Sequence, residues 1–278
     1  MGTIVEFGWL AERLNDAGIV IADCRFTLGQ PDAGRNAYAE GHLPGAVYFD
    51  LERDLSGPVG KHGGRHPLPD MDAFAQKVGQ AGIDSSKTVV VYDDQGGAMA
   101  SRLWWMLRYA GHDGVKLLEG GYGAWKAAGY PTETAVPTPI AARFEASPRP
   151  DMLLSMEDVK ARLGRSGTTL IDAREPRRYQ GLEEPIDPVA GHIPGAINRF
   201  WKDGLDETGR WKNAARQKAR FAGLNPADEI VVYCGSGVTA CPNVLALTEA
   251  GFANVKLYGG SWSDWISYEG NPIATGEE

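Results

Sequence analysis

The sequence repeats itself once, and this duplication limits what the chain can fold into. Three motifs return in the same order: GHLPGA at 41–46 as GHIPGA at 191–196, VVVYDD at 89–94 as IVVYCG at 230–235, and GVKLLEGGYGAW at 114–125 as NVKLYGGSWSDW at 254–265. The offsets are 150, 141 and about 140 residues. A unit of that length can hold its own hydrophobic core. The repeat therefore predicts two similar domains and not a solenoid of short repeats.

A proline-rich segment marks the boundary between the two halves. Residues 131–151 contain five prolines and little apolar periodicity, which is typical of a linker between domains. We therefore expect a first domain over residues 1–135, a linker over 136–151 and a second domain over 152–278.

Short apolar runs alternate with helical patterns in both halves. The predicted strands are Ile19–Ala22, Thr88–Tyr92, Lys116–Leu118, Thr168–Ile171, Glu229–Tyr233 and Val255–Leu257, and the predicted helices include Trp9–Ala17, Met71–Gln80, Ala98–Ala110, Met156–Leu163, Ala214–Ala222 and Pro242–Ala250. Strands separated by helices indicate βαβ units, so each half is predicted to be an α/β domain with a mostly parallel sheet flanked by helices. Such sheets bind ligands beyond the carboxyl ends of their strands, where residues 234–239 lie.

Composition excludes several classes of protein. The chain has 278 residues, 43% of them hydrophobic and 23% charged, which is typical of a globular protein in water. No apolar run is long enough to span a bilayer, and the first residues lack the basic segment of a secretory signal. A net charge of −8 argues against nucleic-acid binding. The three cysteines, Cys24, Cys234 and Cys241, indicate a reducing compartment. We expect a cytoplasmic protein with neither a nucleic-acid nor a membrane partner.

Cys234 is the candidate nucleophile. It follows the predicted strand EIVVY, and Gly235 and Gly237 are expected to take positive φ so that successive backbone N–H groups can point toward the sulfur. These donors and the N-terminus of the following helix favour a thiolate, which is the reactive form of cysteine. A buried, inert cysteine is the alternative. A strand–Cys–Gly-x-Gly–helix arrangement packs poorly, so it favours the reactive interpretation.

Two other chemistries of such a cysteine are disfavoured. Phosphatases of the Cys-x5-Arg type bind phosphate through an arginine six positions after the cysteine, where Ala240 stands here. The chain has no C-x-x-C pair and its five histidines are scattered, so a zinc site formed by His62 and His66 is disfavoured and no metal is expected. Attack on a sulfur atom is the favoured chemistry.

Four motifs together resemble the two-domain sulfurtransferases of the rhodanese superfamily over essentially the whole chain: GHLPGAVYFD at 41–50, DAREPRRYQG at 172–181, GHIPGAIN at 191–198 and CGSGVTA at 234–240. The resemblance implies tandem rhodanese-like domains, of which the first is catalytically silent and the second holds the nucleophile. In agreement, the repeat aligns Asp93 of the first half with Cys234 of the second half.

The resemblance also implies a mechanism. Cys234 would attack a small anionic sulfur donor, thiosulfate or 3-mercaptopyruvate, and form a persulfide, which cyanide, a thiol or a thioredoxin-like protein would then accept. The backbone N–H groups of the loop, from Gly235, Gly237, Val238 and Thr239, would stabilise the persulfide. No metal or organic cofactor is needed. The alternative left open is a persulfide carrier or thiol sensor without turnover.

Further site residues follow from the resemblance. Arg178 matches the family's substrate-binding arginine. Arg174 is a second candidate, although an ion pair that holds the loop is the favoured interpretation for it. In the mercaptopyruvate-using branch a histidine, here His42, is proposed to reach Ser236. The alternative for His42 and His192 is a hydrogen bond to the backbone that fixes a turn.

The preferred donor stays open at this point. Gly235 and Ser236 resemble the mercaptopyruvate-using branch, whereas thiosulfate-preferring animal rhodaneses carry basic residues there. That branch also has a second arginine in an EPR element, which here reads Glu184-Pro185-Ile186. For Cys241, helix packing is favoured over a role as a redox switch that resolves the persulfide.

Overall fold

The computed structural model describes residues 2–277, which form two compact units. Unit 1 contains the chain up to Gly57, then Pro69–Arg149 and Glu207–Trp211, and unit 2 contains Pro58–Leu68, Pro150–Asp206 and the chain from Lys212 onward. Most of the segment 136–151, which was predicted to be a linker, belongs to unit 1, because unit 1 extends to Arg149 and unit 2 resumes at Pro150. The two units also differ from the predicted domains 1–135 and 152–278 at two short segments. Pro58–Leu68, which we call the strap, groups with unit 2, and Glu207–Trp211 groups with unit 1.

Unit 1 has a five-stranded parallel sheet in the order β1-β5-β4-β2-β3. The strands are β1 (Ile4–Val5), β2 (Ile19–Asp23), β3 (Val47–Tyr48), β4 (Thr88–Tyr92) and β5 (Val115–Leu118). The helices are α1 (Phe7–Ala11), α2 (Ala33–Glu40), α3 (Met71–Gln80), α4 (Ala100–Tyr109) and α5 (Gly121–Ala127).

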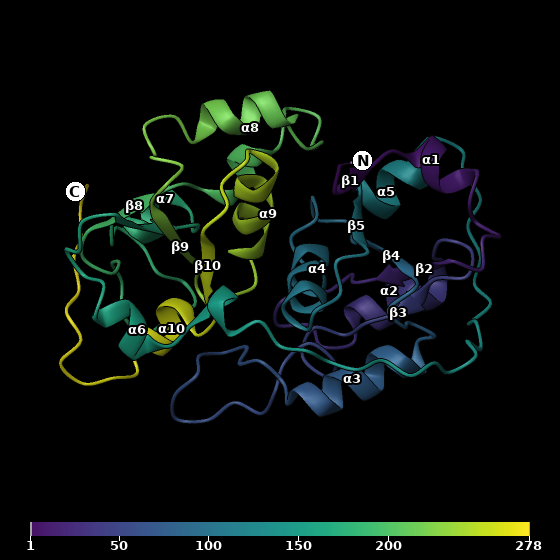
Figure 1. Cartoon of the computed structure of the whole chain (residues 1–278), viewed down its shortest axis with the longest axis horizontal. Helices are drawn as coiled ribbons and strands as arrows, with labels where there is room; N and C mark the ends of the chain where they lie inside the picture. The colour runs from purple at the N-terminus through teal and green to yellow at the C-terminus, as the bar shows by residue number, and fades with distance from the viewer. Residues whose placement is uncertain (1, 278) are drawn as a thin grey trace. The chain divides into compact units, whose positions relative to one another are not determined.

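Unit 2 repeats this architecture with the strand order β6-β10-β9-β7-β8, again all parallel. Figure 1 labels β8, β9 and β10 of this sheet. The strands are β6 (Leu153–Leu154), β7 (Thr168–Asp172), β8 (Ala196–Asn198), β9 (Glu229–Tyr233) and β10 (Val255–Tyr258). The α-helices are α6 (Met156–Lys160), α7 (Pro176–Tyr179), α8 (Ala214–Arg220), α9 (Cys241–Glu249) and α10 (Ser261–Trp265), and 3₁₀ turns lie at Pro150–Met152 and Trp201–Gly204. The predicted α/β class with two parallel sheets is confirmed.

The central strands β4 and β9 are apolar after their first residue, Thr88 or Glu229, because both faces of each sheet are covered. In β9, Val231 and Tyr233 belong to a core cluster that includes Met156 of α6, Tyr179 of α7 and Trp262 of α10. Ile230 and Val232, which point to the other face of the sheet, are also fully buried. A strand of this kind shows no polar alternation, and its length distinguishes it from a helix.

The predicted central strands and the other predicted helices are confirmed, with ends that shift by up to three residues, but the helix predicted over Trp9–Ala17 corresponds to α1, which ends at Ala11. Eight strands and α-helices have no counterpart in the prediction: the edge strands β1, β3, β6 and β8, the one-turn helices α7 and α10, and the helices α2 and α5. Two- and three-residue strands carry too few residues for a periodic pattern. They form because a neighbouring strand supplies the hydrogen-bonding partner.

The same ion pair stands at the carboxyl end of the second strand in both units. Arg25 donates to Asp23 and to the carbonyl oxygen of Gly41, each at 2.6 Å. Arg174 makes the matching bonds to Asp172 and to the Gly191 carbonyl, again at 2.6 Å. These arginines are buried, so each needs its carboxylate partner. The pair ties the strand end to the GH-x-PGA turn.

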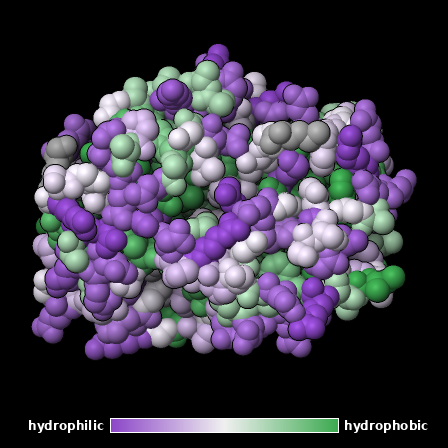
Figure 2. Space-filling model, viewed as in Figure 1, coloured by the Kyte–Doolittle hydropathy of each residue, from purple (hydrophilic) through white to green (hydrophobic). Residues whose placement is uncertain are grey.

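The face shown in Figure 2 is mainly hydrophilic, and its hydrophobic residues form small separate groups. Large exposed hydrophobic side chains are few and spread along the described chain, for example Leu28, Val136, Ile140 and Leu182. Among residues 2–277, none of the helices combines the length and the apolar character needed to cross a bilayer.

The substitution Asp23→Asn tests the buried ion pair. It leaves the Arg25 guanidinium buried without a counter-charge, so we expect the free energy of unfolding to fall by about 3 kcal/mol or more. Urea unfolding followed by circular dichroism measures the change. Asp32→Asn is the control, because Asp32 pairs with Arg53 and both side chains are more than half exposed; its effect should stay within about 0.5 kcal/mol. Equal effects of the two substitutions would contradict the argument.

Candidate active site

The loop Cys234–Ala240 joins β9 to the N-terminus of α9, and helix α10 holds it from one side. The N–H of Trp262 donates to the carbonyl oxygen of Cys234 and the N–H of Ser263 donates to that of Gly235, both at 2.9 Å. The N–H of Cys234 in turn donates to Ser261 Oγ at 3.1 Å. Ser261 has a φ of 56°, and it is the one non-glycine residue with positive φ in the described chain. Strained backbone of this kind is frequent at functional sites.

One of the two loop glycines adopts positive φ, so the prediction was right for Gly237 and wrong for Gly235. Gly237 has a φ of 77°, and a Cβ there would lie 2.1 Å from the carbonyl oxygen of Gly259. Gly235 is required for a different reason. A Cβ at Gly235 would lie 2.8 Å from Arg65 Nη2 and 3.5 Å from Arg178 Nη2, so two guanidinium groups face this point of the loop.

The loop presents backbone donors that the protein itself does not use. Within residues 2–277, the N–H groups of Gly235, Ser236, Val238, Thr239 and Ala240 have no acceptor. The Cys234 side chain is 1% exposed, and its Sγ accepts none of these hydrogen bonds. Buried N–H groups in proteins are almost always paired. A group of free donors beside a cysteine is therefore an anion-binding arrangement.

Unit 1 contains the same loop with its donors occupied. Asp93 aligns with Cys234, because Tyr92 and Tyr233 hold equivalent positions in the register of β4 and β9. Its Oδ1 accepts the N–H groups of Gln95 and Gly97, and its Oδ2 accepts those of Met99 and Ala100, at 2.7–2.9 Å. Burial raises the pKa of the Asp93 carboxyl and the four donors oppose that rise. The two oxygens accept two bonds each, as expected for a carboxylate.

Arg178 is held at the loop by two carboxylates. Its Nε and Nη2 form a bidentate pair with Glu184 at 2.7–3.0 Å, and Nη2 also contacts Asp187 Oδ2 at 3.2 Å. Its side chain is 12% exposed. Burial would raise the pKa of the Glu184 carboxyl, but hydrogen bonds from Arg178 and from the N–H groups of Asp187 and Ile186 lower it below its ordinary value of 4.5.

The role of Arg174 as a substrate-binding residue is not supported. Its guanidinium is bound by Asp172, by Glu184 at 3.1 Å and by the Gly191 carbonyl, and its side chain is 1% exposed. The group also lies over the ring of Trp262. Arg25 makes the corresponding bonds in unit 1, which has no cysteine at its loop. Arg174 therefore holds the fold, as the favoured interpretation of its ion pair predicted.

The strap brings two residues to the loop that the sequence analysis did not select as site residues. His66 Nδ1 lies 2.8 Å from Ser236 Oγ, and the imidazole is buried. Arg65 forms a bidentate pair with Asp187, at 2.9 Å from Nε to Oδ1 and 3.2 Å from Nη2 to Oδ2. Both residues lie about 170 positions before the loop in the sequence, in a segment without periodicity. The signal available was the spacing of charged and glycine residues in KHGGRHPLP, which is weak by itself.

His42 is not the histidine at Ser236, which corrects the expectation from the sequence. Its Nδ1 lies 2.8 Å from the carbonyl oxygen of Tyr38 and its Nε2 lies 3.1 Å from that of Ala135. His192 repeats this arrangement, with Nδ1 2.7 Å from the Tyr179 carbonyl. Each ring also stacks on that same tyrosine. Both histidines therefore bond to the backbone beside the GH-x-PGA turn, as the alternative interpretation stated.

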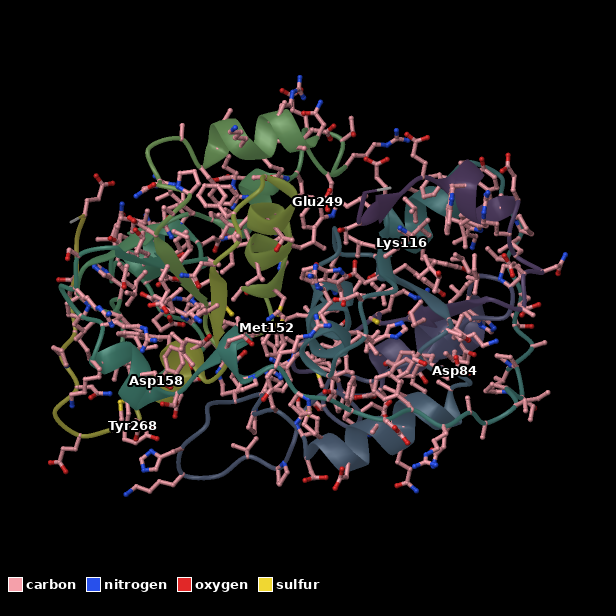
Figure 3. All side chains as sticks on the ribbon, viewed as in Figure 1. Asp84, Lys116, Met152, Asp158, Glu249 and Tyr268 are labelled. Carbon is pink, nitrogen blue, oxygen red and sulfur yellow. The ribbon has the colours of Figure 1, made fainter. Side chains whose placement is uncertain are left out.

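The strap is fastened to α10 and the residues that follow it. The N–H of Gly63 donates to Asp264 Oδ1 at 2.7 Å, and the N–H of Arg65 donates to Ser263 Oγ at 3.1 Å. His62 bonds Ser267 and stacks on Tyr268, which Figure 3 labels. The strap and the catalytic loop therefore share one support, because Ser263 binds both of them.

The other candidate residues are placed as follows. Val238 is buried and Thr239 half-buried, and each offers its backbone N–H. Cys241 is fully buried in the first turn of α9, where its Sγ donates to the Gly237 carbonyl at 3.4 Å, so it supports the loop by packing. All three cysteines are free thiols, and burial raises the pKa of the Cys24 thiol.

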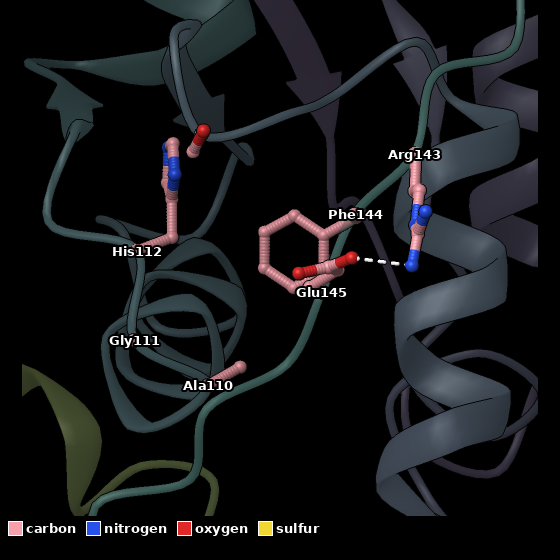
Figure 4. Close-up of a pocket in the computed structure, with 7 residues that line it drawn as sticks. Ala110, Gly111, His112, Arg143, Phe144 and Glu145 are labelled. Carbon is pink, nitrogen blue, oxygen red and sulfur yellow. Dashed lines mark ion pairs between the residues drawn. The ribbon is translucent and has the colours of Figure 1, made fainter.

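A hollow in unit 1 offers no comparable chemistry. Figure 4 shows it beside His112 and the segment that carries Arg143, Phe144 and Glu145. Arg143 pairs with Glu145 at 2.6 Å, and burial lowers the pKa of the His112 imidazole. No cysteine lines this hollow. The Cys234 loop is therefore the stronger candidate site.

The comparison with protein families agrees with this geometry. The sequence model of the family described as "Rhodanese-like domain" matches residues 6–128 and 155–268. The two matches correspond to the two parallel sheets, each with a loop that binds a charged or reactive group at the end of the fourth strand of its unit. The chain belongs to the rhodanese family.

Individual relatives narrow the class further. The chain is 46% identical over 273 residues to a probable 3-mercaptopyruvate sulfurtransferase of Pseudomonas aeruginosa, covering 96% of each protein. It is 39% identical over 270 residues to the putative thiosulfate sulfurtransferase SseB of Mycobacterium tuberculosis, covering 93% of this chain and 91% of that one. The crystal structure of the 3-mercaptopyruvate sulfurtransferase SseA from Escherichia coli superimposes with a TM-score of 0.82 at 34% identity, over 95% of this chain and 100% of SseA. The protein is an enzyme of the sulfurtransferase class.

The substitution Glu184→Gln tests how Arg178 is held. Folding lowers the pKa of the Glu184 carboxyl below its ordinary value of 4.5. The ion pair therefore stabilises the folded state fully at pH values above 4.5. This stabilisation is lost as the pH falls through the lower pKa of the folded state. We expect the variant to be about 2 kcal/mol less stable than wild type at pH 7, with the difference shrinking toward pH 3. Urea unfolding at both pH values measures it.

Glu183→Gln is the matched control, since Glu183 pairs with Arg177 and both side chains are about half exposed. We expect that variant to unfold like wild type at both pH values. A Glu184→Gln effect of the same size at pH 3 as at pH 7 would contradict the ion-pair argument.

Proposed function

We propose that Cys234 takes a sulfur atom from thiosulfate or 3-mercaptopyruvate as a persulfide and passes it to cyanide or a thiol. The Cys234 thiolate attacks the donor sulfur and forms an S–S bond, while the bond from that sulfur to the rest of the donor breaks. Thiosulfate releases sulfite, and 3-mercaptopyruvate releases the pyruvate carbanion, which takes up a proton. An acceptor thiol then attacks the outer sulfur, and the Cys234 thiolate leaves.

The observation that carries this proposal is the match between Asp93 and a persulfide. The carboxylate oxygens of Asp93 lie two bonds beyond its Cβ, and four backbone N–H groups bind them. The outer sulfur of a Cys234 persulfide would also lie two bonds beyond Cβ. The equivalent loop in unit 2 carries free N–H donors instead. These donors are suited to stabilise an anion at that position, and Asp93 provides the reason for a silent first half.

Ser236 and His66 can supply the proton that the reaction with 3-mercaptopyruvate needs. Release of sulfite requires no proton, whereas the pyruvate carbanion does. With Nδ1 protonated, His66 donates to Ser236 Oγ, and the Ser236 hydroxyl can then give its own proton to the leaving group. The pair therefore favours 3-mercaptopyruvate as a donor and has no proton-transfer step to perform with thiosulfate.

The state of the cysteines indicates which acceptors are available for the sulfur. The three cysteines are free thiols, which fits a reducing compartment such as the cytoplasm. Small thiols and proteins with a reactive thiol, such as thioredoxin-like proteins, are available there to accept the sulfur. In the assay cyanide replaces them and yields thiocyanate.

Cys234→Ser should abolish sulfur transfer from both donors to cyanide, measured as thiocyanate, because a hydroxyl cannot form the persulfide. Cys241→Ser is the control and should keep activity within about threefold of wild type, since Cys241 packs in α9. Persulfide on intact wild-type protein is detected by a mass increase of one sulfur. A wild-type protein that carries the persulfide but turns over neither donor would support a sulfur carrier instead of an enzyme cycle.

His66→Ala and Ser236→Ala should lower kcat with 3-mercaptopyruvate by about 100-fold, the usual size of a general-acid contribution. With thiosulfate we expect kcat within about threefold of wild type. The ratio of the two kcat values is the informative quantity, because a general loosening of the loop would reduce both. Equal losses with the two donors would contradict the proton-transfer role.

A further inference from the structure

Unit 2 carries a group of cationic side chains that the reaction described above does not use. They lie in the segments 199–206 and 212–220, which both belong to unit 2. These segments contain six cations and two carboxylates, although the whole chain has a net charge of −8. We call this group the basic surface, and its residues are Arg199, Lys202, Lys212, Arg216, Lys218 and Arg220.

The cations of the basic surface have no counter-ions in the protein. Among residues 2–277, none of the six forms an ion pair with a carboxylate. Lys212 Nζ donates to the carbonyl oxygen of Asp203 at 2.8 Å, and Arg199 Nη1 donates to that of Asn198 at 2.9 Å. The charges are therefore open to carboxylates of a partner, and three of the side chains are fully exposed: Lys202, Arg216 and Lys218.

Helix α8 keeps its cations at a cost in helix stability. Its sequence AARQKAR has three cations and no carboxylate. Arg216 and Arg220 are four residues apart, a spacing at which like charges destabilise a helix. The corresponding helix of unit 1, α3, also connects the third strand to the fourth, and its one cation, Lys77, pairs with Asp54 at 3.0 Å. The fold therefore does not require the cations of α8.

Arg220 shows the same cost at a single side chain. Burial lowers the pKa of its guanidinium to about 10, while the charge of Asp203 opposes this shift and that of Arg199 adds to it. Two of its hydrogen-bond acceptors are the neutral side-chain oxygens of Gln217 and Asn243. A negative charge brought to the basic surface would stabilise the charged form of this arginine.

The basic surface begins at the edge of the sheet that carries the catalytic loop. The N–H of Arg199 donates to the carbonyl oxygen of Asp172 at the end of β7, at 2.9 Å. The N–H of the next residue of that strand end, Ala173, donates to the carbonyl oxygen of Tyr233 at 2.8 Å. Tyr233 directly precedes Cys234. Only the end of β7 thus separates Arg199 from the strand end that presents the nucleophile.

Asn243 joins the basic surface to the helix that follows the catalytic loop. It is buried in the first turn of α9, where its Nδ2 donates to the carbonyl oxygen of Arg199 at 2.7 Å and its Oδ1 accepts from Arg220. Helices α8 and α9 lie side by side within unit 2 (Figure 1). A partner bound to the basic surface is therefore held beside the helix that starts at the catalytic loop.

We propose that the basic surface docks the acceptor of the sulfur, a thioredoxin-like protein with carboxylates around its reactive thiol. The Cys234 side chain is 1% exposed, so an acceptor protein must present its thiol in a defined orientation. Six cations spread over a helix and a turn exceed what one small anion needs, and they match an acidic protein surface. Opposite charges raise the rate of encounter and orient the partner. This inference rests on the proposed function and leaves its transfer step unchanged.

The double substitution Arg216→Glu/Lys218→Glu tests the docking surface, because both side chains are exposed and lie outside the catalytic loop. The probe is a purified thioredoxin with an acidic surface. Sulfide, which the second thiol of thioredoxin displaces as its disulfide forms, is the readout. We expect the KM for thioredoxin to rise at least about tenfold with kcat within about threefold, and the rates with cyanide to stay unchanged. In wild type, the KM for thioredoxin should also rise between about 20 and about 300 mM salt.

Lys160→Glu/Arg165→Glu is the matched control. It changes the net charge of unit 2 by the same amount, and both side chains are exposed. This variant should keep the wild-type KM for thioredoxin. Equal rises in the two double variants would indicate an effect of net charge alone and would contradict a defined surface. Thermal unfolding should be alike in all three proteins, since all four positions are exposed.

A second measurement separates this inference from the proposed function. Calorimetric titration of Cys234→Ser with the same thioredoxin measures docking without turnover. A Kd that weakens at least about tenfold on adding Arg216→Glu/Lys218→Glu supports the surface even if wild type turns over neither donor. Unchanged KM and Kd values, or no binding of thioredoxin to either protein, would overturn the proposal. Binding of an RNA oligonucleotide that the double substitution abolishes, with an unchanged KM for thioredoxin, would assign the surface to nucleic acid instead.

Discussion

Two hydrogen bonds decide the direction in which the catalytic loop presents its donors. The N–H groups of Trp262 and Ser263 bind the carbonyl oxygens of Cys234 and Gly235. In a trans peptide the C=O and the following N–H point in opposite directions. Once α10 has taken those two carbonyls, the N–H groups of Gly235 and Ser236 must face away from it. The anion-binding character of the loop is therefore a consequence of how α10 begins.

The two units have the same loop backbone after the fourth strand, with Asp93 at its start in unit 1 and Cys234 in unit 2. In unit 1 the N–H of Tyr122 binds the Asp93 carbonyl, as Trp262 binds that of Cys234. The backbone N–H groups that follow in the loop donate to the Asp93 carboxylate, so this loop has a structural role only. In unit 2 the shorter side chain of Cys234 does not reach the donors and leaves them open. The residue that ends the fourth strand, Asp93 in unit 1 and Cys234 in unit 2, thus decides whether the loop donors are occupied, while the sheet, the buried Arg–Asp pair and the histidine beside the turn are retained in both.

The sequence predicted those features whose cause is local. The apolar runs at Thr88–Tyr92 and Glu229–Tyr233 predicted the central strands, and the position of Cys234 after a strand and before a helix predicted the loop. The role of Gly235 was missed, since its lack of a side chain makes room for two arginines from elsewhere and does not serve a positive φ. His66 and Arg65 were missed for the same reason. Their place beside the loop comes from where the strap lies, and no periodicity in the strap encodes that position. His42 was chosen in place of His66 because the GH motif is conspicuous, although its ring nitrogens are bound to the backbone.

The strap also bears on how far the two halves can be separated. The sequence suggests a simple cut within residues 131–151, which would give one silent and one active domain. However, Arg65 and His66 belong to the first half by covalent connection and to unit 2 by contact. The segment Glu207–Trp211 is exchanged in the opposite direction, and its Trp211 donates to the Gly96 carbonyl in unit 1. Neither half of the gene therefore encodes a complete unit. Truncation within residues 131–151 would therefore take Arg65 and His66 away from the loop that carries Cys234, and this gives the duplicated arrangement a reason to persist.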